Sequence, residues 1–273
     1  TLNRFKLAGG VKVSGIDPSK ASHQLAKKLY QINTHIGSIE EFNRPKEKYD
    51  LIILTHVLEH LFDPIKGLTR CGKMQDEGGW ILVEVPLFER PDLFPPGMLA
   101  LEHLNYFSEG TILETITRAG YDPIFTGKYF NQNEYPVITI TARKRKNNKI
   151  LISNDYLTGK RLLSDYVNKE KSEWKLLEDK IENHVKSDSS VYIYGAGIHT
   201  SQLLAFTRIK DFVTIIGLLD SSKTKWGKKI GQLECFNKDK IIFNPGDYII
   251  ISSFMFEKEI YERLQPLIDS GIK

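Results

Sequence analysis

The sequence predicts an α/β protein with two mainly parallel sheets, carried by two separate domains. Three observations support this. Short apolar runs alternate with amphipathic helical patterns over the first 142 residues, the same alternation starts again near Val191, and a length of 273 residues exceeds what one hydrophobic core usually serves. We therefore expect two cores, each built from strands and helices in alternation.

Composition excludes several classes of protein. Hydrophobic residues make up 41% and charged residues 26%, and the sequence contains no apolar run near the roughly 18 to 20 residues that a membrane span needs. The net charge of +4 owes much to the run Arg143–Lys149, which is expected to be a solvated connector rather than a nucleic-acid-binding face. Cys71 and Cys235 are too far apart to indicate a disulfide framework or a zinc site, and no metal site is predicted. A reducing cytoplasm and no nucleic-acid or membrane partner are expected.

In the first half, a β-rich run at Val11–Ile16 leads into a helical pattern over Lys20–Tyr30. Leu51–Leu54 is a continuous apolar run of the kind found in buried parallel strands. Ser108 has the position of a helix cap. The other elements expected here are strands at 49–55, 80–85, 121–125 and 137–142, and helices at 64–74 and from about 108. The last two strands indicate an antiparallel ending to the sheet.

The second half opens with one long amphipathic helix, expected over Tyr156–Val185, that is either a packed linker or the dimerising element of a homodimer. Beyond it come strands at 191–194, 213–219 and 248–251 and a helix at 200–206. The predicted domains are 1–147, a linker at 148–188, and 189–273.

Asp17 ends the first expected strand, within the segment GIDPS. A carboxylate at the carboxyl edge of a parallel sheet can accept both hydroxyls of a ribose, and the same side chain could instead cap the helix that follows. The residues alone leave both roles open.

Three more segments follow in order: YDLIILTHVLEHLFDP at 49–64, EVP at 84–86 and EHLNYFS at 102–108. Together with GIDPS they resemble the landmarks of class I S-adenosylmethionine-dependent methyltransferases. The resemblance implies a Rossmann-like fold and S-adenosylmethionine as cofactor. It implies cofactor contacts from Ile16, Asp17, Pro18, Ser38, Ile39, Thr55, His56 and Val57. The pair Glu59-His60 is expected to fix the loop more than to touch ligand.

The first ten residues resemble the helix that follows the glycine-rich turn of such enzymes, so the preceding strand and turn are not seen. A parallel sheet without that central strand would leave ladder groups unpaired. The expectation is that upstream sequence is missing or that the domain is degenerate.

Methyl transfer is an in-line displacement, so the protein must align a nucleophile and, for carbon or hydroxyl acceptors, remove a proton. The segment at 102–108 resembles the acceptor-pocket segment of deoxysugar C-methyltransferases. The resemblance implies His103 as base with Tyr106 beside it and Glu102 at the substrate; hydrogen bonding of the loop is the alternative role of His103. Phe88 and Phe94 are expected either to form an acceptor-side lid or to pack within their loop.

The second domain carries Gly195-Ala196-Gly197 after an apolar strand and Asp220 after the next one, which is half of a dinucleotide-binding fingerprint. Thr200 replaces its third glycine. The domain resembles C-terminal domains attached to sugar methyltransferases, which implies that Gly195, Gly197 and Asp220 help to hold a nucleotide-sugar acceptor.

The sequence thus predicts a methyltransferase that moves a methyl group from S-adenosylmethionine to a small acceptor, such as a nucleotide-linked sugar or polysaccharide precursor. Two alternatives remain: an NAD(P)-dependent sugar oxidoreductase using the second domain, and a non-catalytic nucleotide-sugar-binding module.

Overall fold

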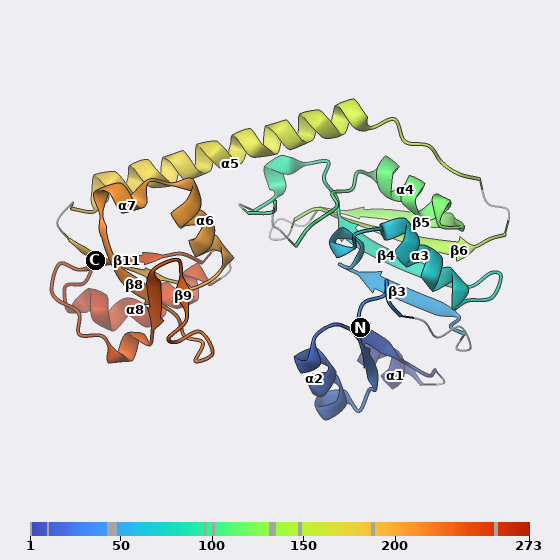
Figure 1. Ribbon diagram of the computed structural model, residues 1–273, viewed down its shortest axis with the longest axis horizontal. Coiled ribbons are helices and arrows are strands. Elements are labelled where there is room, and N and C mark those ends of the chain that lie inside the picture. Colours follow the sequence, from blue (N-terminus) through green and yellow to red (C-terminus); the bar gives the residue numbers. More distant parts are fainter. Residues whose placement is uncertain are drawn as a thin grey trace. The chain divides into compact units, whose positions relative to one another are not determined.

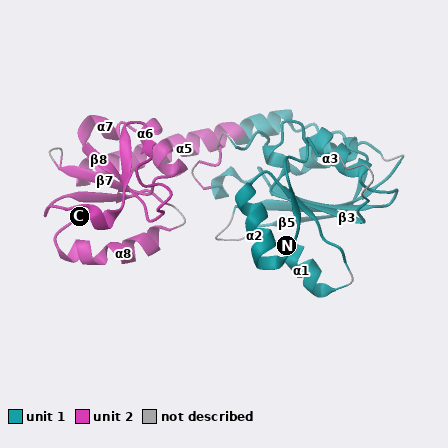
Figure 2. Cartoon of the chain, turned by 60° about the horizontal axis from the view of Figure 1, so that its bottom comes forward, with its two compact units in different colours: residues 1–94, 100–162 teal, residues 95–99, 163–273 magenta. Residues whose placement is uncertain are grey.

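A computed structural model describes residues 2–9, 11–42, 48–95, 97–99, 102–130, 135–146, 149–186, 189–253 and 256–273. The chain forms two compact units (Figure 2). Unit 1 comprises residues 1–94 and 100–162, and unit 2 comprises residues 95–99 and 163–273.

Unit 1 is built on a four-stranded sheet in the order β3-β4-β6-β5 (Figure 1). β3 (Leu51–Thr55) and β4 (Trp80–Pro86) are parallel, whereas β6 (Val137–Lys144) runs antiparallel to both β4 and β5 (Tyr121–Tyr129). The antiparallel ending predicted from the sequence is confirmed. The α/β class of the chain is confirmed with it.

A second, two-stranded sheet in unit 1 pairs β1 (Gly15–Asp17) with β2 (Thr34–Ile36) in parallel. Helix α1 (Leu2–Ala8) precedes it, and α2 (Lys20–Tyr30) has the bounds expected from the sequence. The strand predicted at 11–16 was placed too early, because β2 pairs only with the three residues that start at Gly15. Among the described residues, this sheet shares no strand with the four-stranded one.

Helices α3 (Pro64–Lys73) and α4 (Glu109–Arg118) complete unit 1, and local chemistry sets where both begin. The Asp63 side chain accepts a hydrogen bond from Lys66 N, and a proline occupies the first turn of α3. Ser108 and Thr111 form a reciprocal capping box at α4, which confirms the cap predicted there. The short 3₁₀ helices η1 (Leu58–His60) and η2 (Pro91–Leu93) lie in the loops.

The core of unit 1 lies between the four-stranded sheet and helices α3 and α4. Its fully buried members include Leu58, Leu68, Ile81, Val83, Ile112, Ile116, Ile138 and Ile140. Burial of this apolar surface is the main term that holds the strand ends in place.

The basic run Arg143–Lys149 corrects one sequence expectation. Its first two residues belong to β6, where the Arg143 guanidinium lies 5.2 Å from the centre of the Trp80 ring. Lys144 Nζ donates to the carbonyls of Gly72 and Gln75, each 2.6 Å away. The long aliphatic stems let these residues pack while their charges reach polar partners, so this part of the run is structural rather than a solvated connector. Residues 147 and 148 lie outside the described residues.

Unit 2 contains a five-stranded sheet in the order β11-β7-β8-β10-β9. The four strands β7 (Ser190–Tyr194), β8 (Thr214–Leu219), β10 (Leu233–Phe236) and β11 (Tyr248–Ile251) pair in parallel, and β9 (Lys229–Ile230) pairs antiparallel with β10. The sheet is surrounded by α6 (Ile198–Phe206), α7 (Ile209–Phe212), α8 (Glu257–Asp269) and the 3₁₀ helix η3 (Lys238–Lys240).

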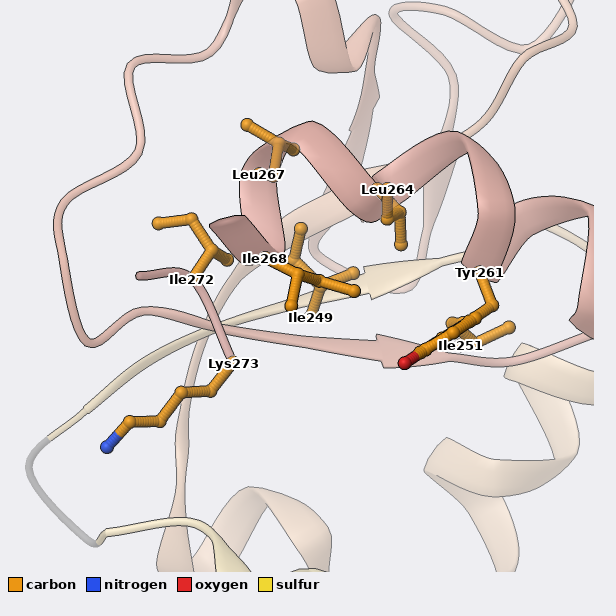
Figure 3. Close-up of a pocket in the computed structure, with 8 residues that line it drawn as sticks. All are labelled: Ile249, Ile251, Tyr261, Leu264, Leu267, Ile268, Ile272 and Lys273. Atoms are coloured by element: carbon orange, nitrogen blue, oxygen red, sulfur yellow. The ribbon is translucent and has the colours of Figure 1, made fainter. Parts of the chain in front are cut away.

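The long predicted helix forms as α5 (Tyr156–His184), with Trp174, Glu178 and Ile181 buried in unit 2. An apolar hollow lies between β11 and α8, lined by residues that include Ile249, Ile251, Leu264 and Ile268 (Figure 3). None of the helices in the described part of the chain is both long and apolar enough to cross a bilayer.

Candidate active site

Asp17 lies half-buried at the carboxyl end of β1. Its Oδ1 accepts a hydrogen bond from Ser19 N at 2.7 Å, and its carbonyl accepts one from Gly37 N at 3.2 Å. The side chain that caps α2 is that of Ser19, which accepts from Ser22 N. The sequence left two roles open for Asp17. The helix cap, which is one of them, is made by Ser19 instead.

The structure places the other residues predicted near the adenosine in different surroundings. Ser38 Oγ accepts from Glu40 N at 3.2 Å and is half-buried. Ile39 is 6% exposed and belongs to the core of unit 1, against which Ile16 also packs. Pro18 is exposed. Ile39 thus faces the core, and Ser38 is the member of the pair with a polar group at the loop.

The next three predicted cofactor residues lie at the carboxyl end of β3: Thr55 is its last residue, and His56 and Val57 follow in the loop. His56 has a φ of +52°, and its main-chain N–H donates to the Glu84 carbonyl at 2.9 Å. Its Nδ1 lies 3.2 Å from Glu59 Oε1, and its Nε2 lies 3.7 Å from Glu84 Oε1. The hydrogen bond to Glu59, together with the charges of both carboxylates, raises the pKa of His56 against the opposing effect of burial.

The segment before α4 is bound to η1 by main-chain and side-chain hydrogen bonds. Leu104 N and Asn105 N both donate to the Glu59 carbonyl, at 2.8 and 3.1 Å. Asn105 Nδ2 donates to the carbonyls of Leu61 at 2.7 Å and Leu58 at 3.3 Å. Four hydrogen bonds from three donor groups on one segment therefore fix the loop that follows β3.

His60 and His103 meet across this junction, with ring centroids 4.9 Å apart. His60 Nδ1 donates to the carbonyl of Glu102 at 2.7 Å, and this bond helps to fix the loop. The Glu102 side chain is exposed. Tyr106 lies beside His103 in an edge-on contact at 6.3 Å between ring centroids. The structure thus brings the two predicted catalytic residues together.

The aromatic residues of the preceding loop are packed inward. Phe88 and Phe94 are 6% and 1% exposed, and their ring centroids lie 5.3 Å apart. Phe88 also contacts Tyr106, and Phe94 stacks on Tyr135. Of the two roles expected for Phe88 and Phe94, the structure supports loop packing.

Sequence reasoning missed the role of Glu59 as the centre of this cluster. Its carboxylate is 2% exposed, touches His56 and lies 3.9 Å from His60 Nε2. Spacing carried part of the signal, because His56 and Glu59 are three residues apart and face each other on one tight turn. The contact with the segment 102–106 had no such local signal.

In unit 2, Gly195 and Asp220 lie at the carboxyl ends of β7 and β8. Gly195 has a φ of +119°, and its N–H donates to the Leu219 carbonyl. The buried Asp220 carboxylate accepts from Ala196 N, Ser222 N and Lys225 Nζ, at 2.8 to 2.9 Å. The acid predicted to bind substrate therefore also holds the glycine turn in shape.

Gly197 differs from Gly195 in its surroundings. It is the N-cap residue of α6, has an extended φ of −137°, and has open space where a side chain would project. Thr200, which replaces the third glycine of the fingerprint, is fully buried and bonds the Gly195 carbonyl and Ser252 Oγ. Thr200 thus has a structural role: it links the glycine turn to Ser252, the residue after β11.

Residues 3–124 match a family model described as "Methyltransferase domain". This part of the chain, a little less than half of its length, is therefore similar to methyltransferase domains. Residues 187–271 match a second model, described as "C2185-like, N-terminal". The two matches fall in the two halves of the chain.

Curated methyltransferases are also similar to part of this chain. An uncharacterized methyltransferase of Bacillus licheniformis is 27% identical over 132 residues, which are 46% of this chain and 62% of the relative. A ubiquinone biosynthesis O-methyltransferase of Bradyrhizobium sp. is 35% identical over 80 residues, 27% of this chain and 31% of the relative. The chain therefore spans less than two thirds of the length of both.

Solved methyltransferase structures resemble about half of this chain at lower identity. A 1,6-didemethyltoxoflavin-N1-methyltransferase of Burkholderia thailandensis, with bound S-adenosylhomocysteine, is 18% identical with a TM-score of 0.42, covering 52% of this chain and 65% of that one. The magnesium protoporphyrin IX methyltransferase of Synechocystis is 17% identical with a TM-score of 0.42, covering 53% and 68%.

Proposed function

We propose that the protein transfers a methyl group from S-adenosylmethionine to a small acceptor. The observation that carries this is the place of Asp17: within the matched methyltransferase domain it stands at the carboxyl end of β1, freed from helix capping by Ser19. Open parallel sheets bind ligands at the carboxyl ends of their strands.

The residues present fit such a cofactor. Within the described residues, the carboxylate of Asp17 has one hydrogen bond, to Ser19 N, so its second oxygen retains acceptor capacity for ribose hydroxyls. The loop of Thr55 and His56 lies at the carboxyl end of β3, where polar main-chain groups would face the methionine end. When bound, the cofactor supplies an electrophilic methyl group on sulfur.

On the acceptor side, the protein must hold a nucleophile in line with that methyl group. The acceptor atom forms a bond to the methyl carbon as the carbon–sulfur bond breaks and its electron pair stays on sulfur. The proton of a hydroxyl or carbon acceptor would pass to His103, which the segment before α4 carries together with Tyr106. Four hydrogen bonds from this segment to η1 keep it fixed.

We further propose a nucleotide-linked sugar or polysaccharide precursor as the acceptor, held with the help of unit 2. In support, Gly197 leaves open space at the N-terminus of the nine-residue helix α6, where main-chain N–H groups suit a phosphate. Glu102 is exposed at the acceptor segment, and Gly195 and Asp220 shape the turn in unit 2.

The first test is calorimetric titration of the full-length protein with S-adenosylhomocysteine. Micromolar binding is expected, weakened about tenfold or more in Asp17→Ala because hydrogen bonds to a charged group contribute about 1.5 to 3 kcal/mol. Asp50→Ala, which removes an exposed carboxylate just before β3, is the matched control and should bind normally. A folded protein that binds no S-adenosylhomocysteine would disprove the proposal.

A further inference from the structure

Three potential metal ligands converge where η1 meets the segment before α4. Glu59, His60 and His103 each offer one ligand atom, and these atoms all lie within 4.8 Å of one another. Two imidazole nitrogens and one carboxylate oxygen are a ligand set suited to divalent first-row transition metals.

The state of Glu59 gives an independent indication of a missing ligand. Its side chain is 2% exposed, and its Oε2 has no hydrogen-bond partner within the described part of the chain. A buried carboxylate oxygen without a partner is costly, and such atoms are scarce in folded proteins. Its Oε1 already faces His56 and His60, so Oε2 is the atom that lacks a counter-charge.

His60 is held in the state that metal coordination needs. A carbonyl can only accept, so the 2.7 Å bond to Glu102 O places a hydrogen on Nδ1, and the Nε2 of the neutral ring then carries a lone pair. Metal-bound histidines commonly donate their other ring N–H to a carbonyl or carboxylate in this way. One bond thus fixes the loop and sets the tautomer of His60.

We propose that Glu59, His60 and His103 bind one divalent transition metal ion such as Zn²⁺. Ligand bonds of about 2.0 to 2.2 Å require the three atoms to close by about 1 Å, which rotation of the side chains can supply. Three protein ligands leave a coordination position open for an exogenous oxygen. If the protein is the methyltransferase proposed above, that position suits an oxygen acceptor. A bound metal would lower the pKa of the acceptor so that its proton passes to solvent, and His103 would then serve as a ligand instead of as the base.

The test is titration of the chelator-treated full-length protein with Co²⁺, followed by visible absorption, and with Zn²⁺, followed by calorimetry. One ion per chain is expected, with the absorption bands of a site of low coordination number. His60→Asn keeps a donor for the Glu102 carbonyl but removes the ligand atom, and His103→Asn removes the other ring. Both should weaken binding about tenfold or more.

His184→Asn is the matched control, because His184 is an exposed histidine whose Nδ1 also bonds a carbonyl, that of Lys180, and it lies outside the cluster. It should bind metal as the native protein does. Glu59→Gln removes the negative charge of the carboxylate but keeps the shape of the side chain. Circular dichroism reports whether each variant is folded. A native protein that takes up no ion, or equal affinity in the folded variants and the control, would overturn the proposal.

Titration with S-adenosylhomocysteine separates this proposal from the one on which its catalytic role rests. A protein that binds metal at the cluster but binds no S-adenosylhomocysteine keeps the metal site and loses the methyltransferase function. A protein that binds S-adenosylhomocysteine but no metal loses the site alone, and His103 then retains the role of base.

Discussion

His60 donates from Nδ1 to the main-chain carbonyl of Glu102, 2.7 Å away and 42 residues further along the chain. This bond joins the loop after β3 to the segment before α4, which carries the predicted catalytic residues. Because the acceptor is a main-chain group, the contact depends on the path of the segment and survives a change of the Glu102 side chain.

The same junction provides a prediction for Asn105. Replacing it with alanine removes the side-chain donor to the carbonyls of Leu58 and Leu61, which should cost about 1 to 3 kcal/mol of unfolding free energy. Urea unfolding followed by circular dichroism measures this. Asn33→Ala, an exposed asparagine in the same unit, should change the free energy by less than about 0.5 kcal/mol. Equal effects of the two substitutions would show that the junction is not a stabilising contact.

A buried hydrogen-bond chain in unit 1 gives the second prediction. Tyr121 is fully buried, its hydroxyl donates to Gln75 Oε1 at 2.7 Å, and Gln75 Nε2 donates to the Trp80 carbonyl. Burial raises the pKa of Tyr121, which favours the protonated, donating form of its hydroxyl. Tyr121→Phe should lower the unfolding free energy by about 1 to 3 kcal/mol, because Gln75 Oε1 is left without a donor.

Tyr129→Phe is the control for this substitution, because Tyr129 lies on the same strand with 52% of its surface exposed. Its effect should be near zero. In a double-mutant cycle, the variant that combines Tyr121→Phe with Gln75→Leu should lose less unfolding free energy than the sum of the two single losses. Both partners of the hydrogen bond are then absent, so neither is left unpaired by the loss of the other. Strict additivity of the two losses would contradict the coupling.

The sequence predicted those elements whose signals are local. Helix α2 follows from the spacing of its apolar residues, and α4 from the cap at Ser108. The sequence did not predict β9, β10 or α8. The two strands lack the continuous apolar run that indicated β11, and a proline at position 266 masks the helical pattern. The basic run that begins at Arg143 was predicted to be solvated because of its charge. The contact of the Arg143 guanidinium with the Trp80 ring is a tertiary contact that the charge of the run does not indicate.

At the candidate site, motif order predicted Asp17, His103 and Tyr106, because each stands in a contiguous segment. It did not find that Glu59 is buried among histidines, since that depends on contact between segments 42 residues apart. Nor did it place Ile39 in the core. Tertiary packing decides which side of a short loop faces inward, and the composition of the loop does not record it.

Glu178 in α5 gives a prediction on pH. Its side chain is buried, and hydrogen bonds from Lys175 Nζ and from the main chain of Arg208, with the nearby positive charges, lower its pKa from 4.5 to about 2. A depressed folded-state pKa contributes stability that is complete above the unfolded value and is lost as the pH falls through the folded one. The melting temperature of unit 2 should therefore decrease as the pH is lowered from about 4.5 to about 2.

Glu178→Gln should flatten that part of the pH profile and lower the melting temperature at neutral pH. Glu262→Gln, an exposed glutamate in α8, should leave both the profile and the melting temperature unchanged. The profiles are compared by calorimetry over the same pH range. An unchanged slope in Glu178→Gln would assign the acid sensitivity of unit 2 to other carboxylates.

The glycines of unit 2 give a prediction that separates structure from ligand binding. A side-chain carbon on Gly195 would lie 2.5 Å from the Ser252 carbonyl oxygen at a φ of +119°, so Gly195→Ala should cost about 1 to 3 kcal/mol or more of stability. Gly197 has an ordinary extended φ and open space, so Gly197→Ala should leave the unfolding free energy almost unchanged. If the turn receives a phosphate, the added methyl group occupies that space, and binding of a nucleoside diphosphate sugar should weaken about tenfold while stability holds. Calorimetric titration with uridine diphosphate glucose measures the first quantity and urea unfolding the second; native-like affinity in Gly197→Ala would exclude the turn as the nucleotide contact.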